Sequence, residues 1–534
     1  MILLVAAALV GVWGSERTVD PAPRGDLTIR RDGWTASLAG FIVPVQVQGN
    51  AIDFQLPAGQ GWFRGALRGG RIEGHFVQPR APAADTAYAT PVVLEPLGAR
   101  AWRGRVEPLE QTFAMYLVVE EGSGGVLPAV LHNPELNLTR RRPLTVEVEG
   151  DRVRLLDRGK DFLHGQIEGD RLILGPDPVD GGSVVLSRRT RDSAVGLYAR
   201  TPEAPVVLRP PLAGNDGWRT TAPDAAGLDG GRLSAMVERI SQPSSPPVHG
   251  VLIARHGKLA FEEYFHGYTA DRLHDLRSAG KTFGTTLVGI AGIDVRAPLA
   301  SFFPEVALGP DKAAITVEHA LTMSTGLACD DDDPESPGEE NRMQGTADWY
   351  RHILELPVLH PAGTFAAYCS GTVNLLGGVI RHATGAWLVD LFADRIARPL
   401  QFGRYAVNLG HNGDMYFAGG LRLRPRDFLK LGQTFLAGGV WNGRRVVPEA
   451  WVRAATQPHA RLNNGSTDGY NWWIQEIGGA RTYNAGGNGG QFVYVVPDRD
   501  LVVAFTGGGY GQFGLMHGFA EQLLAQFVLP AASP

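Results

Sequence analysis

The stretch from Arg277 to Phe283, Arg-Ser-Ala-Gly-Lys-Thr-Phe, constrains this chain more than any other. It opens the apolar segment Thr285–Ala291, which predicts a buried helix. A serine at the start of such a helix lies beside free backbone N–H groups and the positive end of the helix dipole. Lys281 follows Ser278 by one helical turn and shares its face. A desolvated lysine there would be a neutral base beside a nucleophile, whereas the alternative is a capped helix with a surface lysine.

Length and composition limit the possible classes of protein. The 534 residues suggest two or three domains, and 44% hydrophobic with 20% charged residues is typical of globular proteins. A net charge of −5 gives no electrostatic basis for nucleic-acid binding, so we expect no nucleic-acid partner. The histidines show no His-Glu-x-x-His pattern and no spacing of four, so we expect no metal. No signal indicates a cofactor or an oligomeric state.

An apolar run from Ile2 to Gly14 suggests export. At about 13 residues it is short for a bilayer span and has the length of a signal-peptide core. No basic residue precedes it and no clear Ala-x-Ala site follows. We interpret residues 1–18 as a signal peptide or an anchor, which is the only membrane contact expected. The protein would then be periplasmic or associated with the cell envelope. The alternative is a buried strand.

The two cysteines, Cys329 and Cys369, are a candidate disulfide. An even pair in an exported protein favours a bridge over free thiols. It would close a loop of about 40 residues, worth on the order of 4 kcal/mol if the bridge restricts the unfolded chain. The alternative is two unpaired cysteines in the core.

Residues 26–200 combine short strands with glycine-rich turns and show no long helical period. This pattern predicts an all-β domain, either an antiparallel barrel or a sandwich. Its role stays open, and we interpret His75 and His164 as structural. Residues 201–229, rich in Pro, Gly and Ala, predict a linker. The expected strands are 27–30, 34–38, 41–45, 51–56, 115–119, 144–148 and 183–186.

Residues 230–530 predict an α+β domain. An amphipathic helix over 230–240 and a hairpin around His256-Gly257 come first. Strands near the end of the chain enclose a helix-rich middle. This order predicts one antiparallel sheet built from both ends of the segment, flanked by helices and carrying a helical insert. The expected later elements are strands at 470–474, 481–483, 491–496 and 501–506 and a helix over 513–527.

Five landmarks follow one another in this half: Ser278–Lys281, Ile315–Leu327, Pro361–Ser370, Gly419–Phe428 and Ala485–Gln491. In order and spacing they resemble the serine β-lactamase and penicillin-binding protein superfamily. The likeness is greatest to its class C branch, the esterase-like and 6-aminohexanoate-dimer-hydrolase-like serine hydrolases. It covers roughly residues 230–529, and the first two hundred residues lie outside it.

The resemblance implies roles for individual residues. Ser278 would be the acylated nucleophile, and Lys281 and Tyr368 the proton-transfer pair. A phenol near an ammonium has a depressed pKa, so we expect Tyr368 to exchange protons with Ser278 and with the leaving group. The oxyanion hole would consist of the backbone N–H of Ser278 and a second N–H near Gly487 or Asn488.

Two departures from the family pattern concern substrate recognition. Ser370 stands where the second motif usually has Asn, which keeps a hydroxyl but loses an amide that helps to hold substrate and lysine. The third motif, usually Lys-Thr-Gly or His-Thr-Gly, is glycine-rich here, so a cation for the penicillin carboxylate is missing. Both favour ester or amide hydrolysis of small substrates. The alternative is a non-catalytic or weakly acylating penicillin-binding-like sensor of the cell envelope.

An acidic run from Asp330 to Glu335 follows Cys329. A solvated surface loop is the simplest interpretation, and the spacing does not match an EF-hand. If the resemblance holds, the run lies near the rim of the site. It would then favour cationic or amine-bearing substrates.

Overall fold

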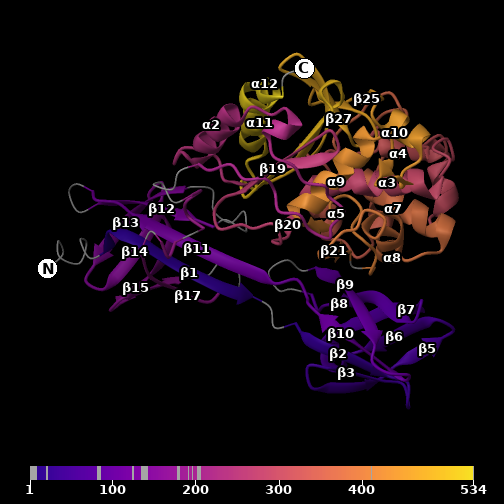
Figure 1. The fold of residues 1–534 in the computed structure, drawn as a ribbon, viewed down its shortest axis with the longest axis horizontal. Helices are drawn as coiled ribbons and strands as arrows, with labels where there is room; N and C mark the ends of the chain where they lie inside the picture. Colours follow the sequence, from indigo (N-terminus) through magenta and orange to yellow (C-terminus); the bar gives the residue numbers. More distant parts are fainter. Residues whose placement is uncertain are drawn as a thin grey trace.

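The structure is a computed structural model. It describes residues 9–19, 22–80, 86–122, 126–133, 142–176, 181–190, 192–194, 196–200, 206–410 and 412–532. Two β structures from the first two hundred residues lie beside a larger domain of sheet and helices (Figure 1).

The first β structure is a closed antiparallel barrel. The chain forms one barrel strand, leaves to build the second β structure and returns for the remaining strands. Inward-facing apolar side chains fill the barrel, among them Trp13, Phe113 and Leu131. In order around the barrel its strands are β1 (Gly11–Val19), β11 (Gln111–Val119), β12 (Leu127–His132), β13 (Arg142–Glu149), β14 (Arg152–Asp157), β15 (Lys160–Glu168), β16 (Arg171–Gly175) and β17 (Val184–Arg189).

The second β structure is an antiparallel sheet with its own apolar core, which includes Phe54, Phe63 and Phe76. The expected strands therefore form, but in two sheets rather than in one barrel or sandwich. The sheet runs in the order β4 (Phe41–Pro44), β3 (Thr35–Leu38), β2 (Gly25–Arg30), β10 (Ala101–Val106), β9 (Ala87–Pro96), β8 (Arg71–Val77), β7 (Trp62–Arg68), β6 (Ala51–Gln55) and β5 (Gln46–Gln48).

The N-terminal apolar run contributes to the barrel. Residues 11–18, interpreted from the sequence as part of a signal or anchor, lie in β1 between β11 and β17. Trp13 is 1% exposed, so this part of the run corresponds to the alternative of a buried strand. Removal of residues 1–18 would take a strand out of the closed barrel. Residues 1–8 lie outside the described part of the chain. Among the described residues, no helix is long and apolar enough to cross a membrane.

The larger domain is built on one antiparallel sheet assembled from both ends of residues 230–530, as expected. Alternate residues of β18 (Val248–Arg255) pack in different cores, because successive side chains of a strand point to opposite faces. Val251 faces α2 (Gly230–Ser241) and α11 (Phe513–Leu523), whereas Leu252 faces the helical insert. The strand order is β19 (Lys258–Tyr264), β18 (Val248–Arg255), β30 (Leu501–Gly507), β29 (Gln491–Val496), β28 (Ala480–Gly487), β27 (Trp473–Ile477), β26 (Thr467–Asp468) and β25 (Ala460–Arg461).

The helical insert covers the second face of this sheet, with α3 (Gly280–Ala291) and α9 (Pro425–Leu436) packed against it (Figure 1). The segment expected to be a linker packs on the domain over its described part, residues 206–229. Trp218 is 4% exposed, and Thr220 forms a β-bridge with Leu259. The helices of the insert are α3 (Gly280–Ala291), α4 (Val317–Leu321), α5 (Glu340–Gln344), α6 (Trp349–Glu355), α7 (Ser370–Thr384), α8 (Leu388–Phe392), α9 (Pro425–Leu436) and α10 (Glu449–Ala455).

A small set of strands joins the second β structure to the larger domain. Strand β20 (His274–Asp275) pairs with β22 (Leu421–Leu423), β22 pairs with β21 (Tyr405–Leu409), and β21 pairs with β9. The N-terminal sheet therefore continues directly into the domain that carries Ser278. The sequence did not predict this connection.

Candidate active site

Ser278 lies in a tight turn, Arg277–Ala279, that leads directly into α3. Arg277 has a φ of 48°, a left-handed conformation that is unusual for a residue other than glycine. The Asp275 side chain supports this backbone, since the Arg277 N–H donates to Asp275 Oδ1 at 3.1 Å. The turn holds Ser278 half-buried at the wall of a cavity. Strained backbone of this kind is concentrated at functional sites.

Lys281 lies one helical turn beyond Ser278, on the same face, as the sequence predicts. Its Nζ donates to Ser278 Oγ at 3.1 Å and to the backbone oxygen of Ala418 at 2.7 Å. The side chain is 2% exposed, so the surface-lysine alternative is wrong.

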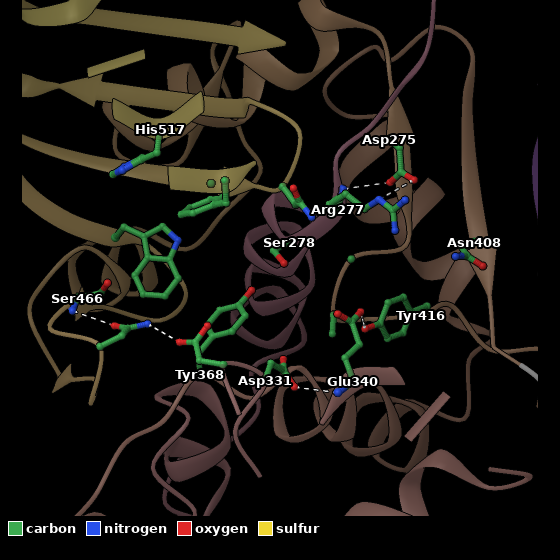
Figure 2. Close-up of a pocket in the computed structure, with 18 of the residues that line it drawn as sticks. Asp275, Arg277, Ser278, Asp331, Glu340, Tyr368, Asn408, Tyr416, Ser466 and His517 are labelled. Carbon is green, nitrogen blue, oxygen red and sulfur yellow. Dashed lines mark hydrogen bonds and ion pairs between the residues drawn. The ribbon is translucent and has the colours of Figure 1, made fainter. Parts of the chain in front are cut away.

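Tyr368 completes a three-residue cluster. Its phenol forms side-chain hydrogen bonds with Ser278 and Lys281. Lys281 Nζ lies 5.0 Å from the centre of the Tyr368 ring. Figure 2 shows the Tyr368 hydroxyl directed toward Ser278. The structure thus brings together the three residues that the sequence singled out for catalysis.

The protonation of this cluster differs from the expectation. Burial raises the pKa of Tyr368, although Lys281 acts to lower it. Burial acts to lower the pKa of Lys281, but Tyr368, Glu340 and Asp331 outweigh it and raise that pKa. The resting pair is therefore an ammonium and a phenol. The expected depressed pKa of Tyr368 is wrong because desolvation of the phenol, which disfavours a phenolate, outweighs the attraction of the Lys281 ammonium.

Asp331 is a residue of this site that sequence reasoning placed in a solvated loop. It lines the cavity, and its Oδ2 accepts from the Ser370 N–H at 2.7 Å. Its Oδ1 accepts from the Glu340 backbone N–H at 3.0 Å, and its own backbone N–H donates to the backbone oxygen of Tyr368 at 2.7 Å. Burial raises the pKa of Asp331 to about 6 against the opposing effect of Lys281. The rest of the run behaves as expected, since Asp333 and Glu335 are exposed.

A disulfide between Cys329 and Cys369 ties this acidic loop to the tyrosine, as predicted. The two Cα atoms are 5.6 Å apart. Cys369 directly follows Tyr368 and caps α7, where its Sγ accepts from the Thr372 N–H at 3.2 Å. The adjacency of Cys329 to the acidic run was the sequence signal that linked this loop to the site.

The residues expected for substrate and oxyanion binding differ from one another in their position relative to the cavity. Ser370 is fully buried and does not line the cavity, and its N–H holds Asp331. Gly487 ends β28 against the turn Arg277–Ala279 that carries Ser278, called the nucleophile turn below. The approach is so close that a Cβ on Gly487 would lie 2.1 Å from the Leu276 backbone oxygen. Asn488 lines the cavity, and its Oδ1 accepts from the Gly511 N–H at 2.8 Å.

The cavity around Ser278 has a volume of about 1040 Å³. One part is aromatic, with Trp473 and Phe513, and much of the remainder is polar. Two lining residues, Thr86 and Tyr88, belong to the N-terminal sheet. The described residues contain no cluster of three or more side chains suited to a metal ion.

Comparison with known proteins places most of this chain in one family. Residues 195–512 match the sequence profile of the beta-lactamase family. A 6-aminohexanoate-dimer hydrolase from Paenarthrobacter ureafaciens is 28% identical over 300 residues. That alignment covers 51% of this chain and 74% of the relative.

A solved structure shares the fold of the larger domain. A putative 6-aminohexanoate-dimer hydrolase from Bacillus anthracis superposes with a TM-score of 0.50 and 16% identity, over 65% of this chain and 98% of that one. A family VIII carboxylesterase gives a TM-score of 0.47 and 14% identity, over 61% of this chain and 100% of that one. Residues 9–194 lie outside the family match.

Proposed function

Because the chain belongs to the beta-lactamase family, we propose that it hydrolyses ester or amide bonds of small substrates through an acyl-enzyme on Ser278. Its relatives in this family include hydrolases. The observation that carries the proposal is the 3.1 Å contact between Lys281 Nζ and Ser278 Oγ, with Tyr368 hydrogen-bonded to both residues.

Proton transfer would begin when the Lys281–Tyr368 pair loses one proton. The resulting amine or phenolate removes the Ser278 proton as Oγ attacks the carbonyl carbon. The same pair then protonates the leaving alcohol or amine, which departs and leaves the acyl group on Ser278. Water, deprotonated in turn by the pair, hydrolyses this ester and restores the serine.

The oxyanion would be held by the Ser278 N–H and by an N–H at the Gly487–Asn488 end of β28. The support is the close approach of that strand end to the nucleophile turn, since a Cβ on Gly487 would also lie 2.9 Å from the Ala279 nitrogen. Two backbone donors fixed before the reaction stabilise the developing negative charge without reorganisation.

The cationic-substrate hypothesis stays a prediction. Asp331 already accepts two backbone N–H groups, and its charge acts to raise the pKa of Lys281. It is therefore engaged within the protein rather than free to bind a cationic substrate. Asp332 also lines the cavity, and its Oδ2 accepts from Asn464 Nδ2 at 3.0 Å. Unchanged kinetics of an amine-bearing ester in Asp332→Asn would contradict the hypothesis.

The test is covalent labelling of the whole protein by a fluorophosphonate and by a fluorescent penicillin, together with turnover of p-nitrophenyl esters. We expect fluorophosphonate labelling and ester turnover that are lost in Ser278→Ala. A matched control, Ser466→Ala, alters another serine of the cavity wall and should keep both. No labelling by either probe and no turnover would favour the rival, a non-catalytic envelope sensor.

Export is part of the same proposal. The disulfide supports it, because such bridges persist mainly in oxidising compartments. Cell fractionation should recover the protein outside the cytosol, and its N-terminal mass will show whether residues 1–18 are removed. Recovery in the cytosol alone would contradict export.

A further inference from the structure

The N-terminal sheet supplies part of the floor of the cavity around Ser278. In the register of the connecting strands, Asp275 lies opposite Arg422, and Asn408 lies opposite Tyr88. Arg422 also lies opposite Ala406, two residues before Asn408 on β21. Because alternate residues of a strand share a face, these side chains lie on one face of the sheet. Asp275, Arg422, Asn408 and Tyr88 all line the cavity, together with Thr86, two residues before Tyr88.

Several polar groups of this floor lack partners among the described residues. Thr86 Oγ1, Asn408 Oδ1 and Arg422 Nε are buried without a hydrogen bond within that part of the chain. Among the described residues, the Arg422 side chain makes only long polar contacts, both through Nη2, to Tyr88 Oη at 3.4 Å and to Asp275 Oδ2 at 3.3 Å. A guanidinium has five N–H donors, so this one retains hydrogen-bonding capacity. The Arg422 side chain is 22% exposed at the cavity wall, so its remaining donors are accessible to a bound molecule.

The charge of the floor is positive. Arg277 and Arg422 share a single carboxylate, that of Asp275, at 3.2 and 3.3 Å. Arg277 is about half exposed, and Arg422 lies over the Tyr88 ring, 5.3 Å from its centre. Figure 2 shows Asp275 and Arg277 on one side of Ser278, and Asp331 and Glu340 on another. The two arginines thus leave one unmatched positive charge on their side of the nucleophile.

We propose that this floor binds a carboxylate group of the substrate, with Arg422 supplying the charge and Tyr88 of the N-terminal sheet acting as a positioning residue. The inference rests on the proposed function and assigns a role to the N-terminal sheet. One surplus positive charge suits a singly charged carboxylate, and the planar guanidinium matches carboxylate geometry. Tyr88 supports Arg422 through its ring and its hydroxyl.

The test compares two p-nitrophenyl esters with acyl chains of equal length. Mono-p-nitrophenyl adipate carries a terminal carboxylate, and p-nitrophenyl hexanoate does not. We expect wild-type protein to prefer the adipate ester. In Arg422→Gln the ratio of the two kcat/KM values should fall about tenfold to a hundredfold, the range for losing a charge-assisted hydrogen bond. Arg422→Lys should keep part of the preference.

Tyr88→Phe is the second variant, and it keeps the test decisive if Arg422→Gln lowers the yield of folded protein. It removes one hydroxyl from the N-terminal sheet and leaves the ring in place. We expect KM for the adipate ester to rise about threefold to tenfold, as for one lost hydrogen bond, and the constants for the hexanoate ester to change by less than this factor. The matched control is Arg444→Gln, an exposed arginine outside the cavity, which should keep the wild-type ratio.

The outcomes separate this inference from the proposed function. An adipate-to-hexanoate ratio that is the same in wild type, Arg422→Gln and Tyr88→Phe would overturn the inference and leave the serine hydrolase intact. If neither ester is turned over, the proposed function fails, and calorimetric titration of adipate into the Ser278→Ala protein decides instead. Binding that weakens at least about tenfold when Arg422→Gln is added supports the carboxylate site, and equal binding refutes it.

Discussion

At the scale of single residues, the site depends on how burial and charge are balanced around Lys281. Its ammonium is almost completely buried, yet Glu340 and Asp331 keep its pKa high. A buried carboxylate beside a buried ammonium reduces the cost of desolvating either group. Asp331 therefore belongs to the proposed proton-transfer machinery together with Tyr368, and it contacts the Pro361–Ser370 landmark through the backbone of Tyr368 and Ser370.

Asp331→Asn should shift the pH dependence of hydrolysis. In the proposed mechanism the Lys281–Tyr368 pair must lose a proton, so kcat/KM should rise as pH rises through the pKa of that pair. Removing the Asp331 charge destabilises the ammonium, lowers that pKa and moves the rise to lower pH. Below about pH 6 Asp331 is itself protonated, and the two profiles should converge. A shift to higher pH, or an equal shift in Asp332→Asn, would refute this role.

Gly487→Ala should disable the site without removing a reactive group. The added Cβ would overlap the Leu276 oxygen and force the end of β28 away from the nucleophile turn. We expect kcat/KM for p-nitrophenyl esters to fall about a hundredfold to a thousandfold, as for the loss of one oxyanion donor. Gly514→Ala, where a Cβ meets nothing within 4 Å, is the control. Near-normal activity of Gly487→Ala would show that the strand end can move without cost.

At the scale of elements, the site is assembled from the ends of structures whose bodies lie in the core. Ser278 precedes α3, Tyr368 precedes α7, and Gly487 ends β28. Helix periodicity fixes the spacing of Ser278 and Lys281, whereas the position of Tyr368 depends on a loop held by the Cys329–Cys369 disulfide. The rigid elements therefore place two of the reactive groups, and a covalent cross-link secures the third.

Replacement of both cysteines by serine should lower stability and activity together. Opening a loop closed over a sequence separation of 40 costs about 4 kcal/mol if the bridge acts through the unfolded chain. Without the bridge, the segment bearing Tyr368 and the loop bearing Asp331 are joined only by hydrogen bonds, so kcat should fall. Chemical denaturation and ester kinetics, with and without reductant, measure both effects. A fall in stability with unchanged kcat would limit the bridge to a structural role.

At the scale of the molecule, the two N-terminal β structures relate to the cavity in different ways. The sheet containing β9 contributes Thr86 and Tyr88 to the lining, whereas none of the lining residues belongs to the barrel. The barrel is filled by its own side chains and has its own core. Its stability and the chemistry at Ser278 should therefore vary independently.

Trp13→Ala tests this independence. Trp13 is 1% exposed inside the barrel, and its Nε1 donates to the Leu9 oxygen at 2.8 Å. Loss of a fully buried tryptophan costs about 3–5 kcal/mol. We expect a lower barrel unfolding temperature in calorimetry and unchanged kcat/KM for p-nitrophenyl esters. The control Ile42→Ala removes a side chain that is 75% exposed and should alter neither. A parallel loss of activity in Trp13→Ala would indicate coupling between barrel and site.

The sequence by itself determined the features that depend on local periodicity and on motif order. These include the helix that follows Ser278 and carries Lys281, the sheet built from both ends of residues 230–530, and the pairing of Cys329 with Cys369. Each follows from a short repeat in the pattern or from a small set of residue types. Some strands of the first two hundred residues, among them those at 27–30, 51–56 and 144–148, were predictable for the same reason, whereas β1 and the strands from β7 to β10 were not.

Only the tertiary structure decided which distant segments meet. The pairing of β9 with β21 joins segments far apart in the chain, and backbone hydrogen bonds between strands leave no local trace in the sequence. Likewise, the charge state of Lys281 and Tyr368 depends on how deeply both are buried and on Asp331 and Glu340 beside them. Burial and long-range electrostatics are properties of the packed molecule, which is why the effect of Asp331 on Lys281 and the contribution of the N-terminal sheet were recognised only in three dimensions.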